Sequence, residues 1–147
     1  MKIIFVLLFA GASLSFADWL TDFEKAKKLA KENDRYILLS FSGSDWCSPC
    51  IRLKKEVFES DAFGELAASS LILFNADFPR GKKNQLPKEI QDRNDELAGQ
   101  YNPLGKFPFT ILLTADGKVI QTWDGFAGND SRLFIDQIKS ALHANNH

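Results

Sequence analysis

The sequence predicts an α/β fold in which helices flank a mixed sheet of four or five strands. Two short apolar runs without helical gaps, 36–41 and 71–76, are typical of strands buried on both faces. Segments with helical spacing surround these runs, which indicates parallel crossovers. Near the C-terminus an Asp-Gly turn joins the strand-like segments 109–113 and 119–123, a strong hairpin signal. The order α, β, α, β, α, β, β, α therefore predicts a parallel first part, then an antiparallel hairpin and a closing helix.

The helices are predicted from caps and apolar spacing. The first is expected over 18–33, because Thr21 to Glu24 match a capping box and Trp19 begins a helical apolar stripe. A second should start at Pro49, since proline is tolerated in a first turn. Ser60 and Asp61 can cap a further short helix. Pro87 can open the next helix, whose apolar stripe is Ile90, Leu97, Ala98 and Tyr101. The closing helix is predicted from the apolar stripe Phe134, Ile138, Ala141 and Leu142.

Residues 1–17 have the pattern of a cleavable secretory signal. A lysine at position 2 precedes the apolar run 3–10, and 15–17 form a small-x-small cleavage site. The apolar run is shorter than the roughly 20 residues that a membrane-spanning helix needs, so an uncleaved anchor is the weaker alternative. We expect one mature domain over 18–147, located in the periplasm or secreted, with no stable membrane insertion after cleavage.

Composition and charge exclude some classes of partner. With 147 residues, 45% hydrophobic and 25% charged, the chain fits one globular domain. Removing 1–17 takes away one lysine and no acid, leaving 17 basic and 19 acidic residues and a net charge of −2. That balance is not the footprint of a nucleic-acid-binding protein. The basic stretch Arg80, Lys82 and Lys83, within the polar loop 78–86, is expected to be solvated; a docking site is the alternative.

The two cysteines, Cys47 and Cys50, are three positions apart. A crosslink closing so small a loop stabilises a fold only modestly, so chemistry explains the pair better than stapling does. A C-x-x-C pair alone also occurs in zinc sites and structural bridges. A structural zinc site needs four N or S ligands, and only His143 and His147 remain as candidates, while the sole methionine is Met1. We therefore expect neither a metal nor an organic cofactor.

The position of the pair predicts a division of labour. Cys47 precedes a helix, whose free N–H groups and dipole favour a thiolate, and Cys50 lies one turn further in. Cys47 should attack a substrate disulfide and Cys50 should resolve the mixed disulfide. Pro49 stiffens the turn between them, and the Ser48 hydroxyl can act as a further donor near the sulfur. Because neither intervening residue is charged and Asp45 opposes thiolate formation, we expect a moderately lowered Cys47 pKa, typical of a reductant or exchanger and not of a primary oxidant.

The sequence resembles the thioredoxin superfamily through four segments that together span essentially the mature chain: 36–41, Trp46-Cys47-Ser48-Pro49-Cys50, Asn75-Ala76-Asp77 and Phe107-Pro108-Phe109-Thr110. The segment 43–47 looks most like thiol:disulfide interchange proteins of bacterial envelopes. The resemblance implies a thioredoxin fold, a redox-active disulfide between Cys47 and Cys50, protein disulfides as substrates and an electron-donating envelope partner.

The same resemblance implies three substrate-binding residues. Pro108 would follow a cis peptide bond and pack against the disulfide, with Phe107 offering its backbone to the substrate; an ordinary trans proline opening a strand is the alternative. Trp46 would be a partly exposed aromatic contacting substrate, with a core tryptophan as the alternative.

Two departures from the superfamily concern proton transfer. The buried Asp of thioredoxins is matched here by Ser40, allowing one inserted residue, and its partner Lys by Leu73. Deprotonation of Cys50 then depends on Asp45 or on water, unless Asp45 is only a turn residue. Rivals to the reductase are a net oxidase or isomerase, and a binding module that uses the Phe107-Pro108 groove with its cysteines locked.

Overall fold

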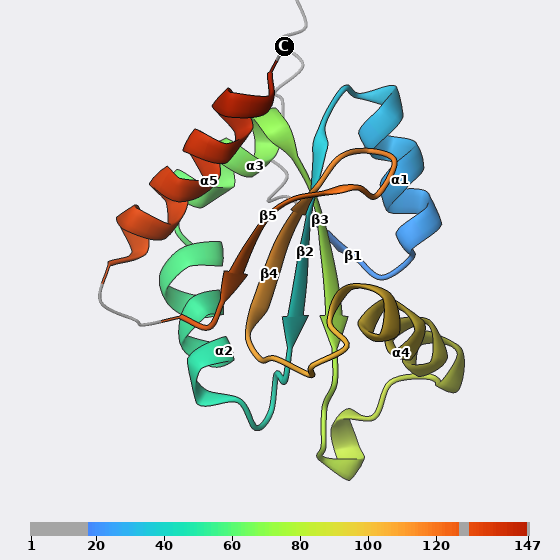
Figure 1. Cartoon of the computed structure of the whole chain (residues 1–147). Helices are drawn as coiled ribbons and strands as arrows, with labels where there is room; N and C mark the ends of the chain where they lie inside the picture. The colour runs from blue at the N-terminus through green and yellow to red at the C-terminus, as the bar shows by residue number, and fades with distance from the viewer. Residues whose placement is uncertain (1–17, 127–129, 147) are drawn as a thin grey trace, which may run out of the picture.

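A five-stranded mixed sheet forms the centre of the protein, in the order β1-β3-β2-β4-β5 (Figure 1). The structure is a computed structural model that describes residues 18–126 and 130–146; the expected signal segment 1–17 lies outside the described residues. The strands are β1 (Trp19–Leu20), β2 (Tyr36–Ser42), β3 (Leu71–Asp77), β4 (Phe109–Leu113) and β5 (Val119–Asp124). β2 pairs in parallel with β3 and antiparallel with β4, so it is the central strand of the sheet and is buried on both faces, as its apolar run predicted.

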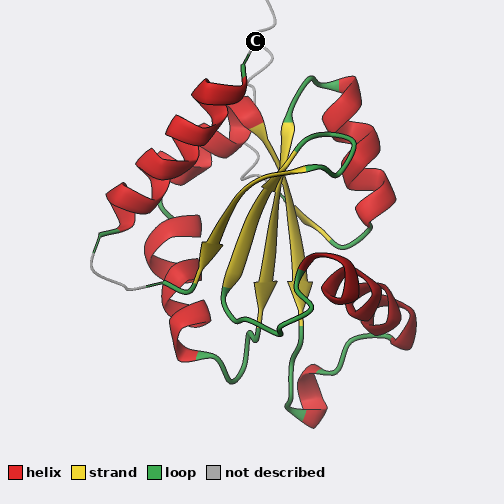
Figure 2. Cartoon of the chain, in the orientation of Figure 1, coloured by secondary structure: helices red, strands yellow, loops and turns green. Residues whose placement is uncertain are grey.

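Helices cover both faces of the sheet (Figure 2). They are α1 (Phe23–Glu32), α2 (Ser48–Leu53), α3 (Asp61–Ser70), α4 (Lys88–Tyr101) and α5 (Ser131–Asn145). A π-helical turn, η1 (Lys54–Phe58), continues α2, and a short 3-10 turn, η2 (Lys82–Asn84), lies in the loop after β3. This arrangement confirms the predicted fold class. Within 18–126 and 130–146, no helix has the length and apolarity needed to cross a membrane.

The side chains of β2 point alternately to the two faces of the sheet and contribute to two separate apolar cores. Leu38 packs with residues of α2, α3 and α5, whereas Ile37, Leu39 and Phe41 pack with residues of α1 and α4. All four side chains are fully buried. Because successive side chains of a strand point to opposite faces, Ser40 lies on the same face as Leu38, toward α2.

The first helix is shorter than predicted. Trp19 and Leu20 form a strand, β1, that pairs in parallel with β3, and the helix begins only at Phe23. Its N-cap is Asp22, whose carboxylate accepts a hydrogen bond from Lys25 N at 3.2 Å, and not Thr21. The Trp19 ring packs against Phe58 in a tilted arrangement, with centroids 4.9 Å apart. Trp19 therefore belongs to the α2 face of the sheet, and pairing with β3 outweighs the helical spacing read from the sequence.

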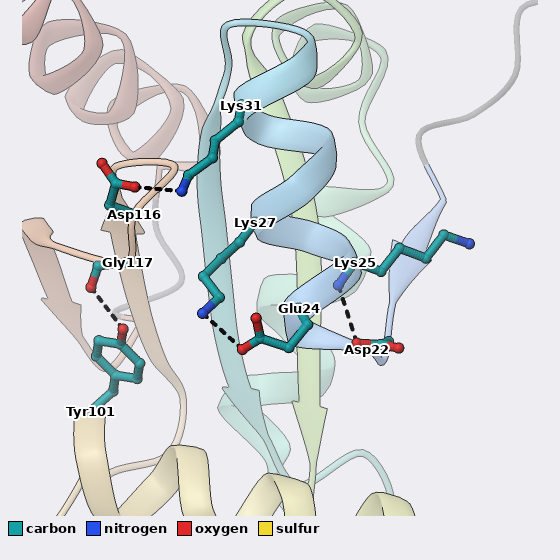
Figure 3. A network of polar contacts seen from close by, with 8 residues as sticks. All are labelled: Asp22, Glu24, Lys25, Lys27, Lys31, Tyr101, Asp116 and Gly117. Carbon is teal, nitrogen blue, oxygen red and sulfur yellow. Dashed lines mark hydrogen bonds and ion pairs between the residues drawn. The ribbon is translucent and has the colours of Figure 1, made fainter.

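Polar contacts fasten α1 and the end of α4 to the hairpin turn between β4 and β5 (Figure 3). Lys31 pairs with Asp116 at 2.7 Å, and the Tyr101 hydroxyl donates to Gly117 O at 2.7 Å. Gly117 has φ +85°, where a side chain is strained, and an added Cβ would lie 2.8 Å from the Tyr101 oxygen. This turn follows the end of β4 that is remote from Pro108.

Candidate active site

The cysteine pair lies where β2 passes into α2. Cys47 is the N-cap of α2 and forms a disulfide with Cys50, with the two Cα atoms 5.2 Å apart. Cys50 N donates a hydrogen bond to Cys47 Sγ at 3.3 Å. Exposure does not distinguish the two residues, since Cys47 is 4% and Cys50 5% exposed. Their difference is electrostatic: Cys47 receives the helix N–H, which favours a thiolate on that sulfur.

The residues between the cysteines form the exposed tip of the turn. Ser48 and Pro49 are both exposed, and Pro49 occupies the first turn of α2, as predicted. Neither brings a charge to the sulfurs. The described hydrogen bonds include none from the Ser48 hydroxyl to Cys47, so the helix N–H is the donor that the described contacts place on the Cys47 sulfur.

A carboxylate at the end of β3 holds the segment that leads into the pair. Asp77 accepts hydrogen bonds from Ser44 N at 2.9 Å and Ser44 Oγ at 2.5 Å, and from Phe78 N at 3.0 Å. Ser42 Oγ lies 3.3 Å from the same carboxylate. In the sequence, Asp77 stands out only as part of a segment that resembles the thioredoxin superfamily. Its position at the carboxyl end of a strand next to β2 is the signal that could have identified it, because such ends meet at one edge of a parallel sheet.

Trp46 is half-buried and tightly held. Its Nε1 donates to Phe78 O at 2.7 Å, and its ring packs edge-on against Phe107, with centroids 5.4 Å apart. The indole also lies across Gly43, where an added Cβ would overlap it. Trp46 is thus neither a free surface ring nor a core residue.

The Phe107–Pro108 peptide bond is cis, as the resemblance implied. Pro108 is buried and, together with Cys50, lines a cavity of about 380 Å³. The polar part of the lining comes from one face of the sheet, from the segment after β2 and from the start of η1: Ser40, Ser42, Ser44, Asn75, Lys54. The apolar remainder includes Trp19 and Phe58. Pro108 and Cys50 therefore line the same cavity.

No carboxylate lines this cavity in the part of the chain that the structure describes. Ser40 is 3% exposed, and Leu73 at the position of the thioredoxin lysine is buried and apolar. Asp45 is engaged elsewhere: its carboxylate accepts hydrogen bonds from Asn84 Nδ2 at 3.0 Å, Arg80 N at 2.9 Å and Gly81 N at 2.7 Å. These bonds, that from Asn84 first, hold the Asp45 pKa below its ordinary value. Asp45 therefore anchors a loop, and of its two predicted roles the structure favours the structural one.

The fold and the paired cysteines define a thioredoxin-fold thiol:disulfide oxidoreductase. Residues 18–115 match the Thioredoxin-like family, and the chain belongs to this family. The chain is 33% identical over 120 residues to the disulfide bond reductase DsbH of Chlamydia pneumoniae, covering 82% of this chain and 70% of the relative.

Two further comparisons agree with this family. The thioredoxin-related protein DsbJ of Chlamydia pneumoniae is 27% identical over 113 residues, which are 77% of this chain but 31% of DsbJ. A solved DsbH oxidoreductase structure is 28% identical and superposes with a TM-score of 0.78, covering 97% of this chain and 95% of that one.

Proposed function

We propose that the protein is a reductase or exchanger of protein disulfides in the cell envelope, and that an electron-donating partner of the envelope re-reduces it. The observation that carries the proposal is the helix N–H of Cys50 on the Cys47 sulfur, in a motif without charged intervening residues. The 33% identity to a protein named as a disulfide bond reductase supports the direction. Export is supported by the signal pattern of 1–17, and recovery of a mature N-terminus at Asp18 would test it.

The catalytic cycle needs two sulfur attacks. The Cys47 thiolate attacks one sulfur of the substrate disulfide, and the other substrate sulfur leaves as a thiolate that takes up a proton. Cys50 then loses its proton and attacks Cys47 Sγ, which releases the first substrate sulfur. Two electrons pass to the substrate, and the Cys47–Cys50 disulfide seen in the structure is the product. A donor dithiol then reduces the Cys47–Cys50 disulfide back to two thiols. No metal or organic cofactor takes part.

The proton of Cys50 needs an acceptor. The lining of the cavity beside Cys50 includes hydroxyl and amide groups and the Lys54 side chain, and the cavity is large enough for water. Because Asp45 is held by the loop after β3, we propose that water in this cavity accepts the proton, with the Ser40 and Ser42 hydroxyls as hydrogen-bonding partners of that water. The missing carboxylate should slow the Cys50 step relative to a thioredoxin, not abolish it.

Substrate recognition is proposed at the rim of the pair. Trp46 and Phe107 pack together, and Pro108 follows them beside Cys50. We propose that a substrate chain contacts the Trp46 ring and forms backbone hydrogen bonds with Phe107 as its disulfide approaches Cys47.

Insulin reduction tests the proposal. With a dithiol donor, the wild-type protein should accelerate precipitation of the insulin B chain, and Cys47→Ala should not. Oxidative refolding of a reduced substrate, measured in parallel, should be the slower activity. A protein with no reversible two-electron step in glutathione buffers and no insulin turnover would instead be a binding module with a locked bridge.

A further inference from the structure

The loop after β3 is a concentration of positive charge on an otherwise acidic protein. Residues 78–86, here called the basic loop, contain Arg80, Lys82 and Lys83 and no acid, whereas the whole chain has a net charge of −1. All three basic side chains are exposed. Within 18–126 and 130–146, none of them forms an ion pair with a carboxylate. Their charge is therefore not neutralised within the described fold.

The basic loop is fastened to the redox motif, while its three basic side chains are solvent-exposed as expected. Asp45 accepts hydrogen bonds from the backbone of Arg80 and Gly81 and from the side chain of Asn84. An added Cβ at Gly81 would lie 2.7 Å from Asp45 Oδ2 and 3.2 Å from Asn84 Nδ2, so glycine is what allows this close approach. Both carboxylate oxygens of Asp45 are used in this way, two residues before Cys47.

The positive charge of Arg80 lies on Trp46, the residue that precedes Cys47. Its guanidinium carbon lies 3.7 Å from the centre of the Trp46 ring, a cation–π contact, and Trp46 itself is held by Phe78 O. A stacked guanidinium keeps its N–H groups at the edge of its plane, where they can bind a carboxylate. A polypeptide whose disulfide reaches Cys47 passes within a few residues of this group.

We propose that the basic loop is a specificity surface that selects protein disulfides flanked by acidic residues, with Arg80 on Trp46 as its fixed centre and Lys82 and Lys83 as its rim. The inference rests on the proposed reductase function. Single exposed ion pairs change affinity by roughly 1.5- to 5-fold, so three cations together give a preference on the order of tenfold. Charges at a rim act mainly on association, and the preference should weaken with salt.

The test uses two peptides, each with one intramolecular disulfide, that differ only in Glu against Gln beside the cysteines. At low salt the wild-type protein should reduce the Glu peptide with a kcat/KM about tenfold higher, and this ratio should fall toward one at high salt. Lys82→Gln/Lys83→Gln, which leaves the Trp46 contact in place, should lose a large part of the preference, and adding Arg80→Gln should remove it. Lys118→Gln/Lys139→Gln, which changes exposed lysines outside the loop, should retain it.

The outcomes separate the two proposals. If neither peptide is reduced, the reductase function itself fails. If both are reduced at equal rates at low salt, or if the loop variants keep the wild-type ratio, the specificity surface is refuted while the reductase function stands.

Discussion

Replacing Asp77 with Ala should destabilise the protein and disturb the redox site together. The carboxylate joins the end of β3 to the segment before the cysteines through Ser42 Oγ, Ser44 N and Ser44 Oγ. Alanine leaves Ser44 N without its acceptor and frees the Ser44 side chain, three residues before Cys47, whereas Phe78 N keeps its hydrogen bond to Ser42 O at 2.9 Å. No core side chain is removed, so the change isolates the polar contacts.

The magnitude follows from the number and exposure of these bonds. A hydrogen bond to a charged group contributes about 1.5–3 kcal/mol when fully buried. Asp77 and Phe78 are half-buried and Ser44 is exposed, so water replaces part of each bond. The carboxylate accepts four bonds, and two of them, from Phe78 N and Ser42 Oγ, come from groups that keep a second partner, Ser42 O and Asn75 Oδ1. Discounting the two bonds from Ser44 to roughly 0.5–1 kcal/mol each and the two shared bonds to a few tenths each gives a loss of about 2 kcal/mol for Asp77→Ala. Ser44→Ala removes only the hydroxyl bond and should cost about 0.5 kcal/mol.

Urea unfolding of the oxidised proteins measures both losses. Asp77→Ala should lower the midpoint by about 1 M with an unchanged slope. In the double variant Asp77→Ala/Ser44→Ala, the loss in free energy of unfolding should be smaller than the sum of the two single losses by at least about 0.5 kcal/mol, because the two side chains share a hydrogen bond. An Asp77→Ala protein that unfolds within about 0.5 kcal/mol of the wild type and reduces insulin at the wild-type rate would refute the proposed role of this carboxylate.

Three further predictions concern separate parts of the molecule. Cys50→Ala should accumulate mixed disulfides through Cys47, recoverable from the exporting cell, whereas Cys47→Ala should trap none; equal trapping by both would reverse their roles. The Asp45 pKa lies below its ordinary value of 3.8, so the loop contacts are complete above that pH and are lost as the pH falls through the lower folded value. Trp46 fluorescence should change in that acidic window in the wild type and not in Asp45→Asn; a shared transition would assign it to other groups. Gly117→Ala should cost about 1–2 kcal/mol in unfolding experiments through its positive φ and leave insulin reduction unchanged, and a loss of activity without destabilisation would contradict this reasoning.

The strands and the cysteine positions were predictable because local patterns encode them. The apolar runs become β2 and β3 with matching register, Leu38 beside Leu73, and the Asp-Gly turn joins β4 to β5. The C-x-x-C pair follows the central strand and opens a helix, which is a feature of neighbouring residues alone. Periodicity and caps need no knowledge of distant partners.

The features missed by the sequence analysis depend on contacts between distant residues. Trp19 fits a helical stripe, but pairing with Leu73 makes it a strand. Asp77 reaches Ser44 across 33 positions, and Asp45 reaches the basic loop across 35 or more. A carboxylate beside a turn has the same local appearance whether it caps its own turn or a remote loop. Equal burial of the two cysteines was likewise not encoded in the spacing that predicted their roles.

The reduction potential of the Cys47–Cys50 pair decides whether the protein works as a reductase or as an oxidant. Equilibration of the purified protein with glutathione buffers, followed by alkylation and mass measurement, yields the oxidised fraction at each potential. A reductase or exchanger should show a two-electron transition between about −200 and −270 mV, the range of glutaredoxins and thioredoxin. A potential near −120 mV, with substrate oxidation faster than reduction, is the behaviour of a strong oxidant and would contradict the proposed direction.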